Sequence, residues 1–171
     1  MAGEPFAVLY CDVVMHYDST PVLKQLIDVY EEFGLGVLAA KEVPKDQIVK
    51  YGSLKLESII DNLFKCSDMV EKPTPEKAPS FYSILGRCIL PPEIFGILEN
   101  TSNGVGGELQ LTDAMKALAK DSGMIAVDFV GKRYDMGSKL GILQAAVEEG
   151  LRNSETKEEF KKYLLELSKK I

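Results

Sequence analysis

Two aspartates, Asp12 and Asp135, are the residues best suited to binding a divalent cation in this 171-residue chain. Asp12 follows the apolar run 6–11, which predicts a buried strand, so it stands at the carboxyl end of a strand, where α/β sheets place their ligands. Asp135 follows a second expected strand and could meet Asp12 across the sheet. Two converging carboxylates would suit Mg²⁺, which prefers carboxylates together with substrate phosphates. A helix-cap or loop aspartate is the alternative interpretation of Asp12, and this feature alone slightly favours it.

A second polar group lies on a loop that proline stiffens. Glu71 and Lys72 are adjacent and are followed by Pro73. The carboxylate could accept hydrogen bonds from sugar hydroxyls, and the ammonium could contact a phosphate. Glu–Lys pairs are also common on surface loops, where they are only solvated, so the pair alone is a weak signal.

Glycines mark two further segments. Gly104, Gly106 and Gly107 precede the segment 108–113, and this loop could cradle an anion at the start of a helix. A plain connection, with Thr112 or Asp113 as a local cap, is an equal alternative. Gly34 and Gly36 match a dinucleotide fingerprint only superficially, because they follow a helix and open a strand, so Gly34 is interpreted as the end of a helix.

The elements that must position these residues follow from hydrophobic periodicity. A helix over 22–33 and a strand over 36–43 make the opening a parallel β-α-β unit. The segment 52–68 favours a hairpin. The other expected elements are a short helix at 44–51, strands at 81–90 and 124–130, and helices at 93–98, around 111–118, at 140–151 and at 160–171.

Composition narrows the class of protein. A length of 171 residues with 46% apolar residues predicts one domain, 1–171, with a real core. The net charge of −6, with acids and lysines mixed, predicts neither a nucleic-acid nor a membrane partner. Cys11, Cys66 and Cys88 are odd in number and widely spaced, which argues against disulfides and favours a cytoplasmic protein. The lone His16 has no second histidine or cysteine near it, so we expect a surface or edge residue.

Several stretches, taken in order, resemble the bacterial UTP–glucose-1-phosphate uridylyltransferases, the nucleotidyltransferase family that makes UDP-glucose. The resemblance covers nearly the whole chain and includes Pro5-Phe6-Ala7-Val8-Leu9, Glu42-Val43-Pro44-Lys45, Val70-Glu71-Lys72-Pro73, Pro92-Glu93-Ile94-Phe95, the stretch 106–114 and Gly131-Lys132-Arg133-Tyr134-Asp135. It implies an α/β nucleotide-diphospho-sugar transferase fold, Rossmann-like, with a mixed and mainly parallel sheet, flanking helices and an incomplete N-terminus.

The resemblance also implies a reaction, in which glucose 1-phosphate attacks the α-phosphorus of UTP and pyrophosphate leaves. Catalysis would be mostly in-line positioning and charge stabilisation by Mg²⁺. Carried over by position, Asp12 and Asp135 would ligate Mg²⁺, Glu71 would accept sugar hydroxyls, Lys72 would contact the sugar-linked phosphate, the Gly52 backbone would touch the hexose, and Lys72 and Asp135 would be the catalytic residues.

Two departures from the family pattern affect the expected activity. The family's Gly-x-Gly-Thr-Arg loop and activating lysine, which hold the UTP phosphates, are absent from the sequence and are expected upstream of Met1. Cys11-Asp12-Val13 replaces the family's Gly-Asp-Asp, so Cys11 adds bulk where the backbone approaches the ligand, and Ser138 replaces a common acid. We therefore expect little turnover by the chain alone.

Two functions follow. The first is the sugar-binding part of a uridylyltransferase with UTP, UDP-glucose and glucose 1-phosphate as ligands. The alternative is a catalytically inactive truncated homologue that serves as a sugar-nucleotide-binding or oligomerisation module. Such a module would associate through its exposed sheet edge and C-terminal helices, and apolar surface exposed where the family's N-terminal half should pack predicts a homo-oligomer. A third interpretation keeps the fold and changes the nucleotide or sugar, as in thymidylyltransferases.

Overall fold

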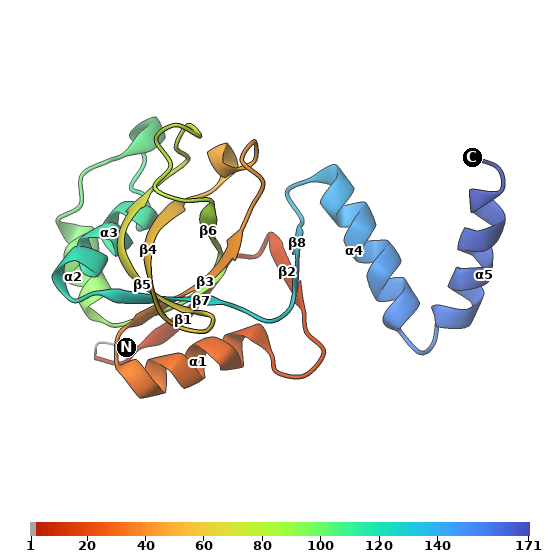
Figure 1. Ribbon diagram of the computed structural model, residues 1–171, viewed down its shortest axis with the longest axis horizontal. Helices are drawn as coiled ribbons and strands as arrows, with labels where there is room; N and C mark the ends of the chain where they lie inside the picture. Colours follow the sequence, from red (N-terminus) through yellow and green to blue (C-terminus); the bar gives the residue numbers. More distant parts are fainter. Residues whose placement is uncertain (1–2) are drawn as a thin grey trace. The chain divides into compact units, whose positions relative to one another are not determined.

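The computed structural model describes residues 3–171 apart from the side chain of Val105, and the chain forms two compact units (Figure 1). The larger unit comprises residues 3–11 together with His16–Lys132, and the smaller unit comprises Asp12–Met15 together with Arg133–Ile171. Each unit carries one group of the residues expected to do chemistry.

The larger unit is built on a six-stranded sheet. Its strands lie in the order β1 (Phe6–Leu9), β6 (Tyr82–Leu90), β3 (Gly36–Glu42), β7 (Met124–Asp128), β5 (Leu63–Val70) and β4 (Ser53–Ile60). β4 also pairs with β6, through Ser53 and Ser83. The strands from β6 to β4 therefore form a closed circuit, and Figure 1 shows β4 and β5 curving across the rest of the sheet.

The mixed sheet with flanking helices is confirmed, but the expectation that it is mainly parallel is wrong for this chain. Among the described pairings of the six-stranded sheet, β3 with β7 is parallel and the others are antiparallel. β1 and β3 do run in the same direction, as predicted, because each is antiparallel to β6. They are not neighbours, since β6 lies between them, and the β4–β5 hairpin adds further antiparallel pairs.

Helices cover both sides of this sheet. α1 (Val22–Phe33) packs against β3, β6 and β7, while α3 (Leu111–Asp121) packs against β5 and against α2 (Glu93–Glu99). Figure 1 shows α1 along one side and α2 with α3 on the other. α1 ends at Gly34 with φ of 65°, a left-handed conformation that favours glycine, so the predicted helix end is confirmed.

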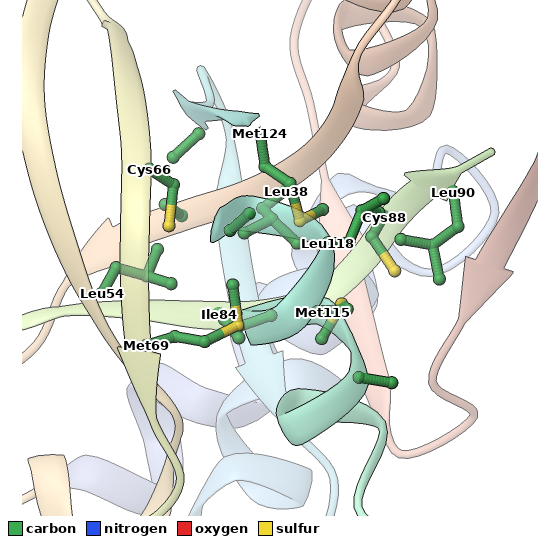
Figure 2. Close-up of a cluster of buried hydrophobic side chains, with 14 of the residues drawn as sticks. Leu38, Leu54, Cys66, Met69, Ile84, Cys88, Leu90, Met115, Leu118 and Met124 are labelled. Carbon is green, nitrogen blue, oxygen red and sulfur yellow. The ribbon is translucent and has the colours of Figure 1, made fainter. Parts of the chain in front are cut away.

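The main core lies between the strands and α3. Figure 2 shows Met115 and Leu118 of α3 surrounded by apolar side chains from the strands. Leu38, Leu54 and Cys66 are fully buried there. Because this packing fixes α3 against β5, it also fixes the first turn of α3 near the end of β5.

One local expectation needs correction. The predicted short helix at 44–51 is only one 3₁₀ turn, η1 (Ile48–Lys50), in which Ile48 alone is buried. Such a segment has too few apolar contacts to hold a longer helix. The glycine loop contains a second 3₁₀ turn, η2 (Val105–Gly107), and it leads into α3 as expected.

The smaller unit contains most of a two-stranded sheet and two helices. β2 (Val13–His16) pairs with β8 (Lys132–Asp135), and α4 (Lys139–Arg152) and α5 (Lys157–Ser168) follow. The helices were expected, whereas β2 and β8 are four-residue strands that the sequence pattern did not indicate. His16 is partly exposed at the end of β2, as expected for an edge residue. No helix in the described part of the chain is long and apolar enough to span a bilayer.

Candidate functional site

In the larger unit, four residues at the ends of β4, β5 and α3 form a polar group that we call the Glu71 cluster: Gly52, Glu71, Lys72 and Thr112. Ser53 opposes Val70 in the β4–β5 hairpin, so the residues just outside this pair, Gly52 and Glu71, lie together. Thr112 is in the first turn of α3, and its hydroxyl donates a hydrogen bond of 2.7 Å to Oε2 of Glu71. The core packing of α3 is what brings Thr112 to this point.

Gly52 lets its neighbours approach closely. A Cβ at this position would lie 3.2 Å from Oε2 of Glu71 and 3.1 Å from Cδ1 of Ile84. The Gly52 carbonyl accepts a hydrogen bond of 3.0 Å from the Ile84 amide, which ties this backbone to β6. The glycine therefore leaves bare backbone beside a fixed carboxylate.

Lys72 has an unusual backbone conformation. Its φ is 43°, in the left-handed region that residues with a side chain rarely occupy. The Lys72 amide donates to the Tyr51 carbonyl at 3.1 Å, which holds the chain in this turn. Its ammonium lies 3.9 Å from Oε1 of Glu71, and the Lys72 side chain is 55% exposed whereas that of Glu71 is 15% exposed. The cluster thus combines a nearly buried acceptor with an accessible cation.

In the smaller unit, Asp12 and Asp135 form what we call the carboxylate pair. The Met136 amide donates to the Asp12 carbonyl at 2.8 Å, which connects the turn before β2 to the end of β8. A Cβ on Gly137 would lie 3.2 Å from Oδ1 of Asp135 and 3.9 Å from Oδ2 of Asp12, so both carboxylates border the same position. The structure therefore brings together two aspartates that are far apart in sequence.

The carboxylate pair already has donors around it. Arg133 makes an ion pair of 2.9 Å with Oδ2 of Asp135, and the Gly137 amide donates to Oδ1 at 3.1 Å. In the described part of the chain, no group of three or more His, Cys, Asp or Glu side chains is arranged to hold a metal ion. Two carboxylates nevertheless fit Mg²⁺, which takes its remaining ligands from water and substrate phosphates.

The comparisons with known proteins show the family of the chain. No protein-family model matches the chain. The UTP–glucose-1-phosphate uridylyltransferase of Pseudomonas aeruginosa is 44% identical over 146 residues, covering 85% of this chain and 52% of that protein. The enzyme of Staphylococcus epidermidis is 40% identical over 167 residues, covering 98% of this chain and 58% of that protein. The chain belongs to the UTP–glucose-1-phosphate uridylyltransferase family.

A solved structure supports the same assignment. The crystal structure of a UDP-glucose pyrophosphorylase complexed with UDP-glucose matches with a TM-score of 0.85 at 39% identity, over 88% of this chain and 58% of that chain. The present chain therefore spans little more than half the length of the curated and solved proteins that it matches.

The uridylyltransferase resemblance did not single out every residue that shapes the two groups. Thr112 appeared only as a possible helix cap, yet α3 has no side-chain cap hydrogen bond and the Thr112 hydroxyl bonds to Glu71. Gly141 in α4 also escaped notice, although a Cβ there would overlap the Asp135 carbonyl oxygen. The role of Thr112 depends on a contact between segments 41 residues apart, whereas that of Gly141 depends on how tightly the chain turns from β8 into α4.

The glycine loop of this uridylyltransferase homologue favours the plainer of its two interpretations. A Cβ on Gly104 would overlap the carboxylate of Asp113, so the acid packs directly against the loop backbone. The Gly104 amide donates to the Glu108 carbonyl at 2.8 Å, within the loop itself. A negative charge in this place disfavours an anion, and the glycines serve the close packing of loop and helix.

Proposed function

We propose that this chain is the sugar-phosphate-binding part of a UTP–glucose-1-phosphate uridylyltransferase. The proposed reaction converts UTP and glucose 1-phosphate into UDP-glucose and pyrophosphate. The observation that carries the proposal is the Glu71 cluster, in which a fixed carboxylate beside bare backbone lies next to an accessible ammonium. Sugar hydroxyls need acceptors and a phosphate needs a cation, and the cluster offers both.

In the proposed mechanism, the residues of this chain mainly bind and orient. Glu71 accepts hydrogen bonds from sugar hydroxyls, the Gly52 backbone lies against the hexose, and Lys72 contacts the sugar-linked phosphate. A phosphate oxygen then attacks the α-phosphorus of UTP, and the bond to the β-phosphate breaks as pyrophosphate departs with the electron pair. No covalent enzyme intermediate is needed, so positioning supplies most of the catalysis.

The carboxylate pair is the proposed place for Mg²⁺. Asp12 and Asp135 would hold the ion, which neutralises charge on the phosphates when bound. Arg133 would keep Asp135 oriented through the ion pair that the two already form. All three cysteines are free thiols, which supports the cytoplasmic location that we propose.

Binding and turnover test the proposal separately. Isothermal titration with UDP-glucose should show heat of binding, and Lys72→Ala should weaken it, because the phosphate loses its cation. No heat with the wild-type chain, or unchanged affinity in K72A, would refute the sugar-phosphate site.

Pyrophosphate release from UTP, glucose 1-phosphate and Mg²⁺ should be small, since the sequence contains no Gly-x-Gly-Thr-Arg loop. Robust turnover that Asp135→Asn abolishes would contradict that expectation.

The second candidate is a module that associates with itself. The observation in its favour is the apolar surface of the C-terminal helices, where Leu140 and Leu143 are each 63% exposed and Tyr163 is 57% exposed. Leu140 and Leu143 are about one helical turn apart, and adjacent exposed apolar side chains of this kind are typical of interfaces. We propose a homo-oligomer, in which a second copy covers these side chains.

A further inference from the structure

The Thr112 hydroxyl makes one hydrogen bond as a donor, to Glu71. The residue is 8% exposed, and its Oγ1 donates to Oε2 of Glu71 at 2.7 Å. A threonine hydroxyl has a single proton to donate. Because α3 has no side-chain cap hydrogen bond, that proton is not used at the helix end.

The position of Thr112 is itself firmly held. Ala114 and Met115, the second and third residues after it, are fully buried in the core against the strands. The adjacent Asp113 packs against the backbone of Gly104 on the other side. The first turn of α3 is therefore a rigid support, and the hydroxyl that it presents to Glu71 is fixed in place.

The hydrogen bond fixes the Glu71 carboxylate at one oxygen. Oε2 accepts from Thr112 and lies near the Gly52 backbone, while Oε1 lies 3.9 Å from the Lys72 ammonium. A glutamate that is held only by a solvated lysine would sample several rotamers, and ordering them on binding costs free energy. A hydroxyl–carboxylate hydrogen bond removes that cost before the ligand arrives.

We propose that Thr112 is a positioning residue that orients the Glu71 carboxylate to accept a sugar hydroxyl. The inference rests on the proposed function, since it assigns a sugar to the Glu71 cluster. Under this proposal, different residues recognise the two parts of the sugar phosphate. Thr112 affects binding of the sugar through Glu71, whereas Lys72 binds the phosphate. Loss of the Thr112 hydroxyl should therefore weaken sugar recognition and spare phosphate recognition.

The test compares glucose 1-phosphate with inorganic phosphate as probes of the intact chain, by NMR titration. Thr112→Val keeps the shape of the side chain and removes the hydroxyl, so affinity for glucose 1-phosphate should fall about tenfold. Affinity for inorganic phosphate should stay within about twofold of wild type, because Lys72 is unchanged. Thr112→Ser restores the hydroxyl and should recover most of the lost affinity.

Thr101→Val is the matched control. The Thr101 hydroxyl donates to the Ile97 carbonyl at 2.8 Å, at the end of α2, and does not contact Glu71. This substitution removes a comparable hydrogen bond, so it should lower stability while leaving affinity for glucose 1-phosphate as in wild type. A similar loss of affinity in T101V would mean that general destabilisation causes the effect, and the inference would be overturned.

The remaining outcomes separate the inference from the proposed function. If wild type binds glucose 1-phosphate no better than inorganic phosphate, the sugar site fails and the inference fails with it. If wild type prefers the sugar phosphate and T112V keeps that preference, the inference alone is overturned.

A double-mutant cycle with Glu71→Gln covers the case in which T112V is too unstable to titrate. The variants in this cycle are Thr112→Ala, which removes the hydroxyl without adding bulk, Glu71→Gln and the combination of both, and urea unfolding measures their midpoints. Midpoint shifts that are not additive would support an energetic link between the two side chains. Additive shifts would overturn the inference.

Discussion

The three cysteines have different surroundings in the folded chain, which their sequence neighbours do not indicate. Cys11 is exposed, whereas Cys66 and Cys88 are buried in the core. Burial raises the pKa of Cys66 and of Cys88 to about 12 in each case. At pH 8 roughly one buried thiol in ten thousand is then ionised, so the thiolate that reacts with alkylating reagents is nearly absent.

This difference predicts selective labelling. Iodoacetamide at pH 8 should modify Cys11 in the folded protein and all three cysteines in urea, as read by mass spectrometry. Cys11→Ser should abolish the rapid native labelling. Rapid modification of Cys66 or Cys88 without denaturant would contradict the buried positions that the core gives them.

Asp68 offers a pH-dependent test of the larger unit. Burial alone would raise the pKa of this carboxyl, but a hydrogen bond from Lys116, one from the Met69 amide and the charge of Lys120 outweigh burial and lower it. The Lys116 ammonium lies 3.1 Å from Oδ1 and the Lys120 ammonium 4.0 Å from it. These lysines belong to α3, so the ion pair fastens that helix to β5.

Because the pKa of Asp68 is lower in the folded state, the unfolded chain binds its proton first as the pH falls. The stabilisation is complete above the unfolded pKa of about 3.9 and is lost as the pH falls through the folded pKa. Asp68→Asn should cost less than about 1 kcal/mol at pH 7, because the pair is a third exposed. Urea unfolding of both proteins should show this difference shrinking below about pH 4. A difference that grows in acid would contradict the assignment.

The chemistry of single residues was only partly predictable from the sequence. Asp12 directly follows the apolar run 6–11, and Asp135 comes five residues after the apolar run 124–130, so the sequence indicated that the two could meet across the sheet. The structure places both carboxylates beside Gly137. Thr112 could not be found in this way. Its hydrogen bond to Glu71 spans 41 residues and exists only because α3 packs against β5.

At the level of elements, local periodicity was sufficient where each segment packs on one face. Periodicity predicted α1, the β4–β5 hairpin and α3, because the spacing of apolar residues indicates which side of a helix or strand is buried. It could not give the order of strands. β6 inserts between β1 and β3 from far along the chain, and the four-residue strands β2 and β8 are too short for a clear alternation.

Helix α4 is held against the carboxylate pair by close backbone contact. Gly141 lies in its first turn, and a Cβ there would overlap the carbonyl oxygen of Asp135 and lie 3.0 Å from its carbonyl carbon. Farther along the helix, the Tyr134 hydroxyl donates to Glu148 at 2.8 Å and accepts from Arg152 at 2.8 Å. These contacts anchor α4 to β8 at both places, so the helix start has little freedom to move.

Gly141→Ala should therefore force α4 and Asp135 apart. We expect a loss of about 1–3 kcal/mol in unfolding free energy, as for other overpacked positions, and weaker binding of Mn²⁺ as a probe of the carboxylate pair. Water proton relaxation would measure Mn²⁺ affinity.

Gly96→Ala is the control, because Gly96 is in α2 with nothing within 4 Å of a Cβ. It should stabilise by about 0.5–1 kcal/mol and leave Mn²⁺ binding unchanged. Equal effects of both substitutions would refute the contact.

On the scale of the whole molecule, the two groups of functional residues belong to different units. The Glu71 cluster lies in the larger unit and the carboxylate pair in the smaller one. Each group is built from contacts inside its own unit, namely α3 with β5 in one and α4 with β8 in the other. Sugar binding and metal binding should thus respond to different substitutions, as the Thr112 and Gly141 variants are designed to show.

The molecule also exposes apolar side chains in two places that a second copy could cover. One is the sheet edge, where β1 pairs only with β6 among the described strands and Leu9 is 53% exposed. The other is α4, where Leu140 and Leu143 are each 63% exposed. An open edge strand and an apolar helix face are both common routes to self-association. They predict different consequences of substitution.

Light scattering after size-exclusion chromatography measures the mass of the wild type and of variants in each face, and so identifies the face that forms the contact between copies. Wild type should show a mass above that of one chain, 18.9 kDa, rising with concentration. Leu143→Glu should return the mass to one chain if α4 forms the contact, because a carboxylate cannot be buried unpaired in an apolar interface. Leu9→Lys should do so if the edge of β1 forms it, since an edge lysine blocks strand pairing. Ile60→Glu is the control, because Ile60 is 59% exposed at the end of β4 and belongs to neither β1 nor α4. A wild-type chain that stays a clean monomer at every concentration would contradict the homo-oligomer altogether.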